Sequence, residues 1–268
     1  MNFRSDEVYL VLGKSKSGKT ELASYFARNF KSVVIYETLL KKNYMNIHGI
    51  KSTANPKDIS LFQKQGEKGK APLPFYMKIK FYLRDHLTLL DPVITELFKR
   101  RDTFFILEES QMLFRIGKNP SQVQTAMLRA GAHDWAIGQC YLTQKISDLN
   151  KIVLTQMNHC FFFQTWLKND IDYICENFGE QCRDILPRLR HVENDNPADH
   201  EFLYVRDSIP RFIGYLDGNQ IKIVRSIEQE VNPTTANEEK EMKQENENQI
   251  EVNETKDSEM RGVQAQTV

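Results

Sequence analysis

The residues that point most directly to chemistry form a glycine-rich loop near the start of the chain. An apolar run at 8–12 precedes this loop, and apolar residues at helical spacing follow it at 22–30. A strand, a tight turn and a helix in this order aim backbone N–H groups and a helix N-terminus at a phosphate chain. The pattern predicts a nucleotide site in which Lys19 contacts the β- and γ-phosphates and Thr20 holds Mg²⁺. The loop has the form G-x-x-x-x-G-K-[ST] and consists of Gly13, Lys14, Ser15, Lys16, Ser17, Gly18, Lys19 and Thr20.

A pair of acids follows a second apolar run. Residues 104–107 are apolar, and Glu108 and Glu109 come directly after them. Because consecutive strand residues point in opposite directions, two adjacent acids can divide their work. One would hold the Mg²⁺ shell, and the other would orient the attacking water. We assign the metal role to Glu108 and the water role to Glu109; a solvated acidic strand end is the alternative.

Two more polar residues flank the predicted strand at 136–142. Gln144 follows it, at the carboxyl edge of the sheet where ligands of α/β proteins bind, and is predicted to sense the γ-phosphate. Arg129 lies ahead of the strand and is a candidate arginine finger for a neighbouring subunit's nucleotide. A surface arginine that caps its helix is the alternative interpretation of Arg129.

Alternating elements must position these residues. The stretch 38–74 has little periodicity and is predicted to be an excursion on the surface. The alternation predicts an α/β fold: a mostly parallel, doubly wound sheet with a small antiparallel addition at one edge. Further strands are expected at 32–37, 77–83, 160–163 and 201–205, helices at 87–98, 122–129, 148–157, 170–178 and 181–189, and a hairpin turn at 217–220.

Charge divides the chain of 268 residues into two parts. The formal net charge is zero, but 227–268 carries 11 acidic and 4 basic residues, a net charge of −7. The other 226 residues therefore carry 32 basic and 25 acidic residues, a net charge of +7. We expect an ATPase domain at 1–226 and a disordered acidic tail at 227–268, because the tail has no aromatic residue with which to build a core.

Composition limits the other function classes. No run of 18 apolar residues suggests a membrane span. The four cysteines form no CxxC pair and are expected to be buried thiols in a reducing compartment. Basic residues gather in two places, where they could follow DNA phosphates or simply be solvated. These are Lys64, Lys68, Lys70, Lys78, Lys80 and Arg84 in the first place, and Arg115 and Lys118 in the second.

Taken together, these motifs resemble the FtsK–HerA superfamily of ring-shaped DNA-pumping ATPases. The compact genome-packaging ATPases of membrane-containing viruses are the most similar members. The resemblance covers roughly residues 6–225 and implies a RecA/FtsK-like core that binds ATP and Mg²⁺. By position it implies that Lys19 and Thr20 bind nucleotide and metal, that Glu108 binds the metal and that Glu109 orients the attacking water. It also implies that Gln144 senses the γ-phosphate and that Arg129 is the trans-acting finger. The family usually places Arg and His close together, whereas here Arg129 and His133 are separated by three residues.

The resemblance also implies partners and a location. We expect a homo-hexamer that encircles double-stranded DNA without reading its sequence, with a capsid or portal-vertex protein as a further partner and no membrane span. The expected location is the host-cell cytoplasm, with association with the virion as an addition. Two other classes stay open: a small-molecule or nucleoside kinase, and a zonula-occludens-toxin-like phage assembly ATPase, although proteins of the latter class carry a membrane segment.

Overall fold

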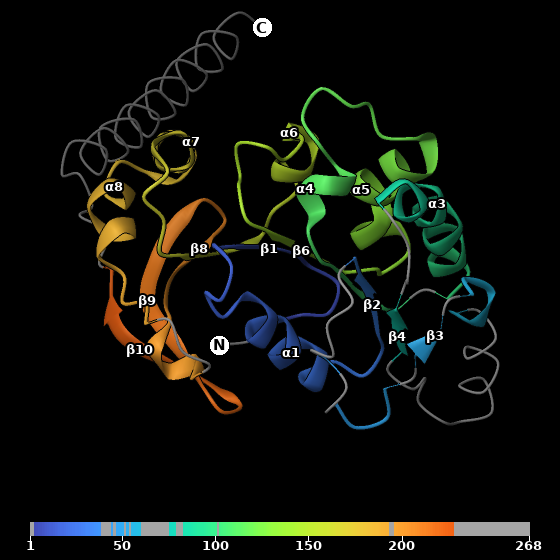
Figure 1. Ribbon diagram of the computed structural model, residues 1–268, viewed down its shortest axis with the longest axis horizontal. Coiled ribbons are helices and arrows are strands. Elements are labelled where there is room, and N and C mark those ends of the chain that lie inside the picture. Colours follow the sequence, from blue (N-terminus) through green and yellow to red (C-terminus); the bar gives the residue numbers. More distant parts are fainter. Residues whose placement is uncertain are drawn as a thin grey trace, which may run out of the picture. The chain divides into compact units, whose positions relative to one another are not determined.

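The computed structural model describes residues 3–38, 44, 47–50, 52–53, 55–59, 75–78, 83–100, 102–192 and 196–227 (Figure 1). The predicted acidic tail lies outside the described residues except for Ile227. The side chains of the first group of basic residues, Lys64 to Arg84, also lie outside the part that the structure describes.

A twisted sheet runs through the centre of the domain. Within the described residues it has ten strands, in the order β10-β9-β8-β7-β1-β6-β5-β2-β4-β3. The strands from β7 to β3 are parallel, and β8, β9 and β10 pair antiparallel beyond β7. This confirms the predicted fold class. The bounds are β1 Val8–Leu12, β2 Val33–Glu37, β3 Ser52–Thr53, β4 Phe75–Lys78, β5 Phe104–Leu107, β6 Gln139–Thr143, β7 His159–Phe163, β8 Glu201–Arg206, β9 Ile209–Asp217 and β10 Gln220–Ser226.

Helices cover both faces of the sheet, and each face has its own apolar core. Helix α1 (Lys19–Asn29) lies on one face (Figure 1). Its residues Leu22 and Phe26 belong to the core on that face. The opposite face is covered by the other α-helices, which contribute Ile94, Met127 and Ile174 to the second core. The central strands β1, β2, β5, β6 and β7 are buried along their whole length, which explains their continuous apolar sequences. The other helices are α3 Leu83–Arg100, α4 Ser110–Leu113, α5 Gln122–Asp134, α6 Lys151–Leu154, α7 Lys168–Phe178 and α8 Cys182–Ile185, with 3₁₀ turns at Leu186–Arg188 and Pro197–Asp199.

Several elements differ from their predicted bounds. Strand β4 ends at Lys78 and helix α3 already begins at Leu83, so the predicted strand at 77–83 is too long. Pro92 consequently lies well inside α3. Helix α5, predicted to end at 129, continues to Asp134, and β6 begins at Gln139 where the strand was predicted from 136.

The stretch 38–74 is not confined to the surface. Tyr44 and Ile59 are fully buried, and Ile47 is only 5% exposed. Tyr44 and Ile47 join the core beneath α1, whereas Ile59 joins the core on the other face. Irregular backbone has no repeating period, so its buried residues cannot be recognised from spacing.

Candidate nucleotide site

The glycine-rich loop joins β1 to α1 in a compact turn. The backbone N–H of Gly13 donates to the carbonyl of Thr143 at the end of β6 (3.1 Å). Gly18, with φ at +93°, has a backbone conformation that suits glycine, and it comes directly before the first residue of α1. A Cβ on Gly13 would lie 2.3 Å from Ser17 Oγ, so the loop can close this tightly only with glycine there. The exposed members of the loop are Ser15 and Lys16.

Lys19 and Thr20 begin α1 on the inner side of this loop. Lys19 is 9% exposed, and its Nζ donates to the carbonyl oxygens of Gly13 (2.6 Å) and Lys14 (2.7 Å). The Thr20 hydroxyl lies 3.3 Å from Glu108 Oε1. The two motifs that the sequence separates by almost ninety residues therefore meet directly.

The paired acids diverge at the end of β5. Glu108 is buried, whereas Glu109 is half-buried and adopts the left-handed conformation (φ +49°). Such a conformation is costly for a residue with a Cβ and is often found at functional sites. The backbone turn, more than strand alternation, sends the two carboxylates in different directions, since β5 already ends at Leu107.

The environment of Glu108 acts on its protonation in opposite directions. Burial raises the pKa of Glu108, and the charge of Glu109 acts in the same direction. The hydrogen bonds from Tyr44 and Thr20 and the charge of Lys19 oppose this shift. A divalent cation between Thr20 and Glu108 would favour the ionised carboxylate. The donors are a hydroxyl and a carboxylate, which are the oxygen ligands that Mg²⁺ prefers, so these residues fit the ion.

Gln144 meets Glu109 across the carboxyl edge of the sheet. Its Nε2 donates to both Glu109 oxygens, at 2.8 and 3.1 Å. This contact follows from strand order: β6 lies between β1 and β5, so the residue after β6 stands between the loop and the acids. Gln111 Nε2 donates to Glu109 as well, at 2.6 Å. Glu109 is thus held by two amides beside the glycine-rich loop.

Arg129 does not join this group within one chain. It is exposed and lies in the second half of α5, which ends near the edge where β5 and β6 begin. The hydrogen bond from Asp102 N, just ahead of β5, to Trp135 O marks that edge (3.3 Å). The glycine-rich loop lies at the opposite edge, so Arg129 as a finger stays a prediction that concerns a neighbouring subunit.

Tyr44 is a site residue that sequence reasoning missed. Its hydroxyl donates to Glu108 Oε1 at 2.6 Å from a buried position. Burial raises the pKa of Tyr44 well above its ordinary value, which keeps the hydroxyl protonated as a donor. A lone aromatic residue in a stretch without periodicity carries no sequence signal for this contact.

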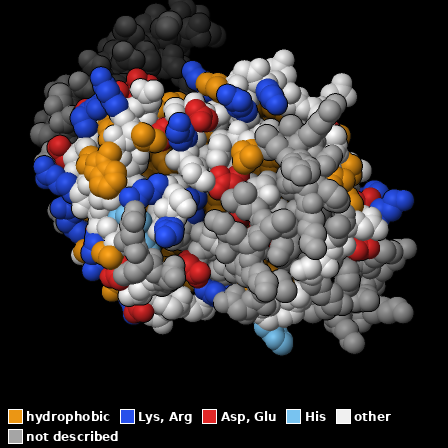
Figure 2. Space-filling model, viewed as in Figure 1, with side chains coloured by type: hydrophobic (Ala, Val, Ile, Leu, Met, Phe, Trp, Pro, Cys, Tyr) orange, Lys and Arg blue, Asp and Glu red, His pale blue; other side chains and the backbone are white. Residues whose placement is uncertain are grey.

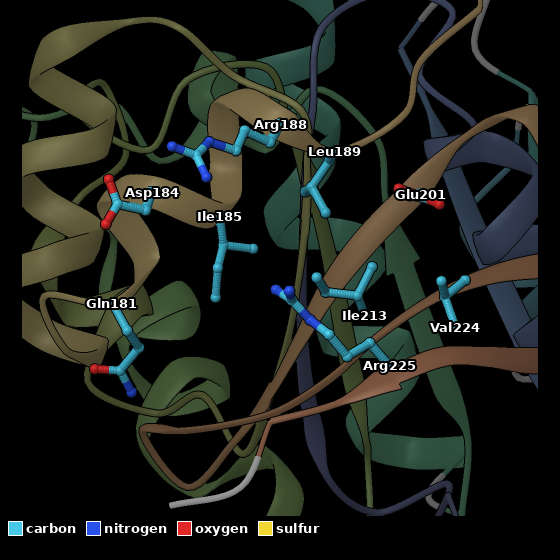
Figure 3. Close-up of a pocket in the computed structure, with 9 residues that line it drawn as sticks. All are labelled: Gln181, Asp184, Ile185, Arg188, Leu189, Glu201, Ile213, Val224 and Arg225. Carbon is cyan, nitrogen blue, oxygen red and sulfur yellow. The ribbon is translucent and has the colours of Figure 1, made fainter. Parts of the chain in front are cut away.

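The structure also has a pocket away from these residues. It lies between α8 and the antiparallel strands, has a volume of about 480 Å³, and contains none of the predicted nucleotide-binding residues (Figure 3). Arg188 and Arg225 line it together with Asp184 and Glu201, so its charges are mixed.

The strand order, the loop between β1 and α1, and the acids after β5 together define the fold of a P-loop NTPase. No family model and no curated protein matches the sequence. Solved structures do share the fold. The genome packaging NTPase B204 from Sulfolobus turreted icosahedral virus 2, in complex with ATP-gammaS, has a TM-score of 0.59 and 16% identity, over 84% of this chain and 100% of that chain.

Two further B204 structures agree with this. The complex of the same protein with AMPPCP has a TM-score of 0.56 and 19% identity, over 85% of this chain and 100% of that one. The DNA-packaging ATPase B204 from Sulfolobus turreted icosahedral virus has a TM-score of 0.57 and 18% identity, over 84% of this chain and 100% of that chain. The resemblance to viral genome-packaging ATPases is therefore confirmed at the level of the fold. Among the described residues, no helix is long and apolar enough to cross a membrane.

Proposed function

We propose that this protein is an ATPase that uses ATP hydrolysis to move double-stranded DNA, with packaging into a viral capsid as its task. The contact that carries the proposal is the one between Glu109 and Gln144 beside the glycine-rich loop. A carboxylate held by an amide at this place is suited to orient a water for attack on the γ-phosphate. The fold shared with the B204 packaging NTPases supports the proposal of a packaging ATPase.

Each loop residue has a role in this proposal. The backbone N–H groups from Gly13 to Thr20 would cradle the phosphates, with the start of α1 adding its favourable dipole. Lys19 would exchange its contacts with loop carbonyls for the β- and γ-phosphate oxygens. Thr20 and Glu108 would hold Mg²⁺, which would neutralise charge that develops between the β- and γ-phosphates.

The ring and its partners belong to the same proposal. We propose a homo-hexamer in which Arg129 of one subunit acts on the nucleotide of its neighbour. Its exposed position, far from its own chain's loop, is compatible with this role. Arg115 and Lys118 lie in an exposed turn soon after the paired acids, where they could follow DNA phosphates. Figure 2 shows further Lys and Arg side chains along the left and upper parts of the face it presents. The capsid or portal contact and a cytoplasmic or virion-associated location complete the proposal.

A kinase needs basic residues that close over the phosphates. The arginines between residues 165 and 190 are Arg183, Arg188 and Arg190, and two of them make contacts elsewhere. Arg183 pairs with Glu180 and, at 2.7 Å, with Asp172. Arg190 Nη2 donates to the carbonyl of Ala198 at 2.6 Å. These contacts favour the motor over the kinase.

The test compares ATP hydrolysis by the wild-type chain, Glu109→Gln and Glu176→Gln, with and without duplex DNA. Glu176 is an exposed acid on α7 and serves as a matched control. We expect DNA to stimulate hydrolysis in the wild type and in the control. Glu109→Gln should lose roughly 10²-fold or more in kcat, because general-base assistance is worth that much, while it still binds ATP.

Phosphate transfer to a nucleoside in the absence of DNA would overturn the motor in favour of the kinase. Electron microscopy of the protein with an ATP analogue and duplex DNA tests the ring. A hexamer around DNA supports the proposal, and a persistent monomer contradicts it.

A further inference from the structure

The glycine-rich loop has two different flanks, and only one of them carries the acids. On the β6–β5 side stand Gln144, Glu108 and Glu109. On the other side β1 pairs with β7, which leads into the antiparallel edge. A triphosphate whose γ end faces Glu109 must direct its α-phosphate and nucleoside toward β7.

The β7 flank is packed closely against the start of α1. A Cβ placed on Gly18 would lie 3.3 Å from Phe163 Cε1 and 3.3 Å from His200 Cβ. The chain leaves β7 at Phe163 and turns through Thr165, whose Oγ1 accepts from Leu167 N at 3.3 Å. This turn brings Trp166 beside the loop.

Trp166 is a large aromatic residue that is exposed on this flank. Its side chain is 59% exposed, whereas most large aromatic side chains of the domain are buried. The Nζ of Lys14, a member of the glycine-rich loop, lies 4.8 Å from the centre of the Trp166 ring. The exposed indole offers an aromatic face, and the contact with Lys14 places it beside the residues that are predicted to bind the phosphates.

We infer that Trp166 forms the nucleobase subsite of the nucleotide site, with its indole stacked on the base. The inference rests on the proposed function, because it needs the triphosphate in the glycine-rich loop. Stacking uses the π-face that every base has, so the class of ligand is a nucleoside triphosphate held by the loop at one end and by the ring at the other. In this arrangement Lys14 lies between the two ends, over the ring and next to the phosphates.

The test measures dissociation constants by calorimetry for two probes, a non-hydrolysable ATP analogue and inorganic triphosphate, each with Mg²⁺. Inorganic triphosphate fills the loop but has no base. Trp166→Ala should raise Kd for the ATP analogue about tenfold, as the loss of one base–aromatic stack predicts. It should leave Kd for triphosphate within about twofold of the wild type. Leu167→Ala, a change at the neighbouring exposed residue (48%), is the matched control and should leave both constants unchanged.

Fluorescence provides a second measurement. The chain has two tryptophans, and Trp135 packs against Phe98 with ring centres 4.6 Å apart. In a Trp135→Phe background the emission reports Trp166 alone, and the ATP analogue should quench it more strongly than triphosphate does. Equal loss of affinity for both probes in Trp166→Ala, or no loss for either, would overturn the subsite while leaving the phosphate loop intact. If the wild type binds neither probe, the proposed function fails together with the subsite.

Discussion

Glu108 depends on a residue that lies outside every recognisable motif. Tyr44 reaches it from the segment after β2 and donates a hydrogen bond to the oxygen that also faces Thr20. A group that orients a metal ligand in this way affects metal affinity without touching the metal. The residue-level chemistry of the site therefore extends to a side chain that only the folded structure brings in.

Tyr44→Phe should consequently lower the affinity of the site for Mg²⁺. The variant keeps the ring in its buried place and removes only the hydroxyl. We expect the Mg²⁺ concentration for half-maximal ATP hydrolysis to rise about tenfold, the lower end of the range for residues that support a metal ligand. Tyr25→Phe, on α1, is the control, and thermal melting checks that both variants fold. An unchanged Mg²⁺ dependence in Tyr44→Phe would show that Glu108 needs no such support.

At the scale of elements, the motifs that lie on regular structure were predictable. The loop after β1 and the acids after β5 follow short, fully buried strands, whose apolar runs are strong local signals. The contact between Gln144 and Glu109 was expected only as proximity to the γ-phosphate, because strand order is a property of the sheet and not of one segment. Tyr44 was missed, since an irregular stretch gives no period that would reveal which residues are buried. The early start of α3 was missed because the alternating residues at 77–83 favoured a strand there.

The entry to β6 depends on another contact between distant segments. Gly138 N donates to the carbonyl of Ser5 at 3.1 Å, and Gly138 O accepts from Phe105 N at 2.8 Å. A Cβ on Gly138 would lie 2.1 Å from the Ser5 oxygen, which is far inside van der Waals contact. Because the obstacle is backbone, a small side-chain movement cannot relieve it.

Gly138→Ala should therefore destabilise the domain. We expect a loss of roughly 1–3 kcal/mol in the free energy of unfolding, the usual cost of overpacking, measured by urea denaturation. Gly131→Ala in α5 is the comparison and should cost less: there the closest atoms, at 2.8 Å, are the side-chain ends of Gln139 and Met127, which can shift, and alanine improves helix propensity. If Gly138→Ala is as stable as the wild type, the N-terminal segment does not hold the start of β6.

At the scale of the whole molecule, the two edges of the sheet carry different groups of residues. The carboxyl edge carries the phosphate loop, the acids and Gln144. The opposite edge carries Arg129 and a buried histidine. In the proposed ring Arg129 would act on the nucleotide of a neighbouring subunit, and hydrolysis would then depend on assembly.

The buried histidine, His159, connects its own strand, β7, to three other parts of the fold. It is fully buried, its Nε2 lies 2.8 Å from Glu7 Oε2, and its Nδ1 lies 2.7 Å from the Tyr204 hydroxyl. Its ring also stacks on Tyr9, with centres 4.4 Å apart. It therefore connects the N-terminal segment and β1 to β7 and β8.

This environment sets how stability depends on pH. Burial is the largest effect and lowers the pKa of His159 below its ordinary value of 6.5; Arg206 acts in the same direction, while Glu7 and Asp207 oppose it. In the unfolded chain the imidazole takes up a proton near pH 6.5, whereas in the folded domain it does so only at lower pH. Stability from this group is therefore fully present above pH 6.5 and is lost as the pH falls toward the folded pKa.

We expect the free energy of unfolding, measured by urea denaturation, to decrease between pH 7 and about pH 5.5, by at most roughly 1.4 kcal/mol per pH unit for one proton. His159→Asn removes the titrating group, so its slope over this range should be smaller even though its stability at pH 7 is lower. His133→Asn, a change at an exposed histidine, should keep the wild-type slope. An equal slope in wild type and His159→Asn would mean that the Glu7 carboxylate compensates the burial of the imidazole, and that His159 contributes nothing to acid sensitivity.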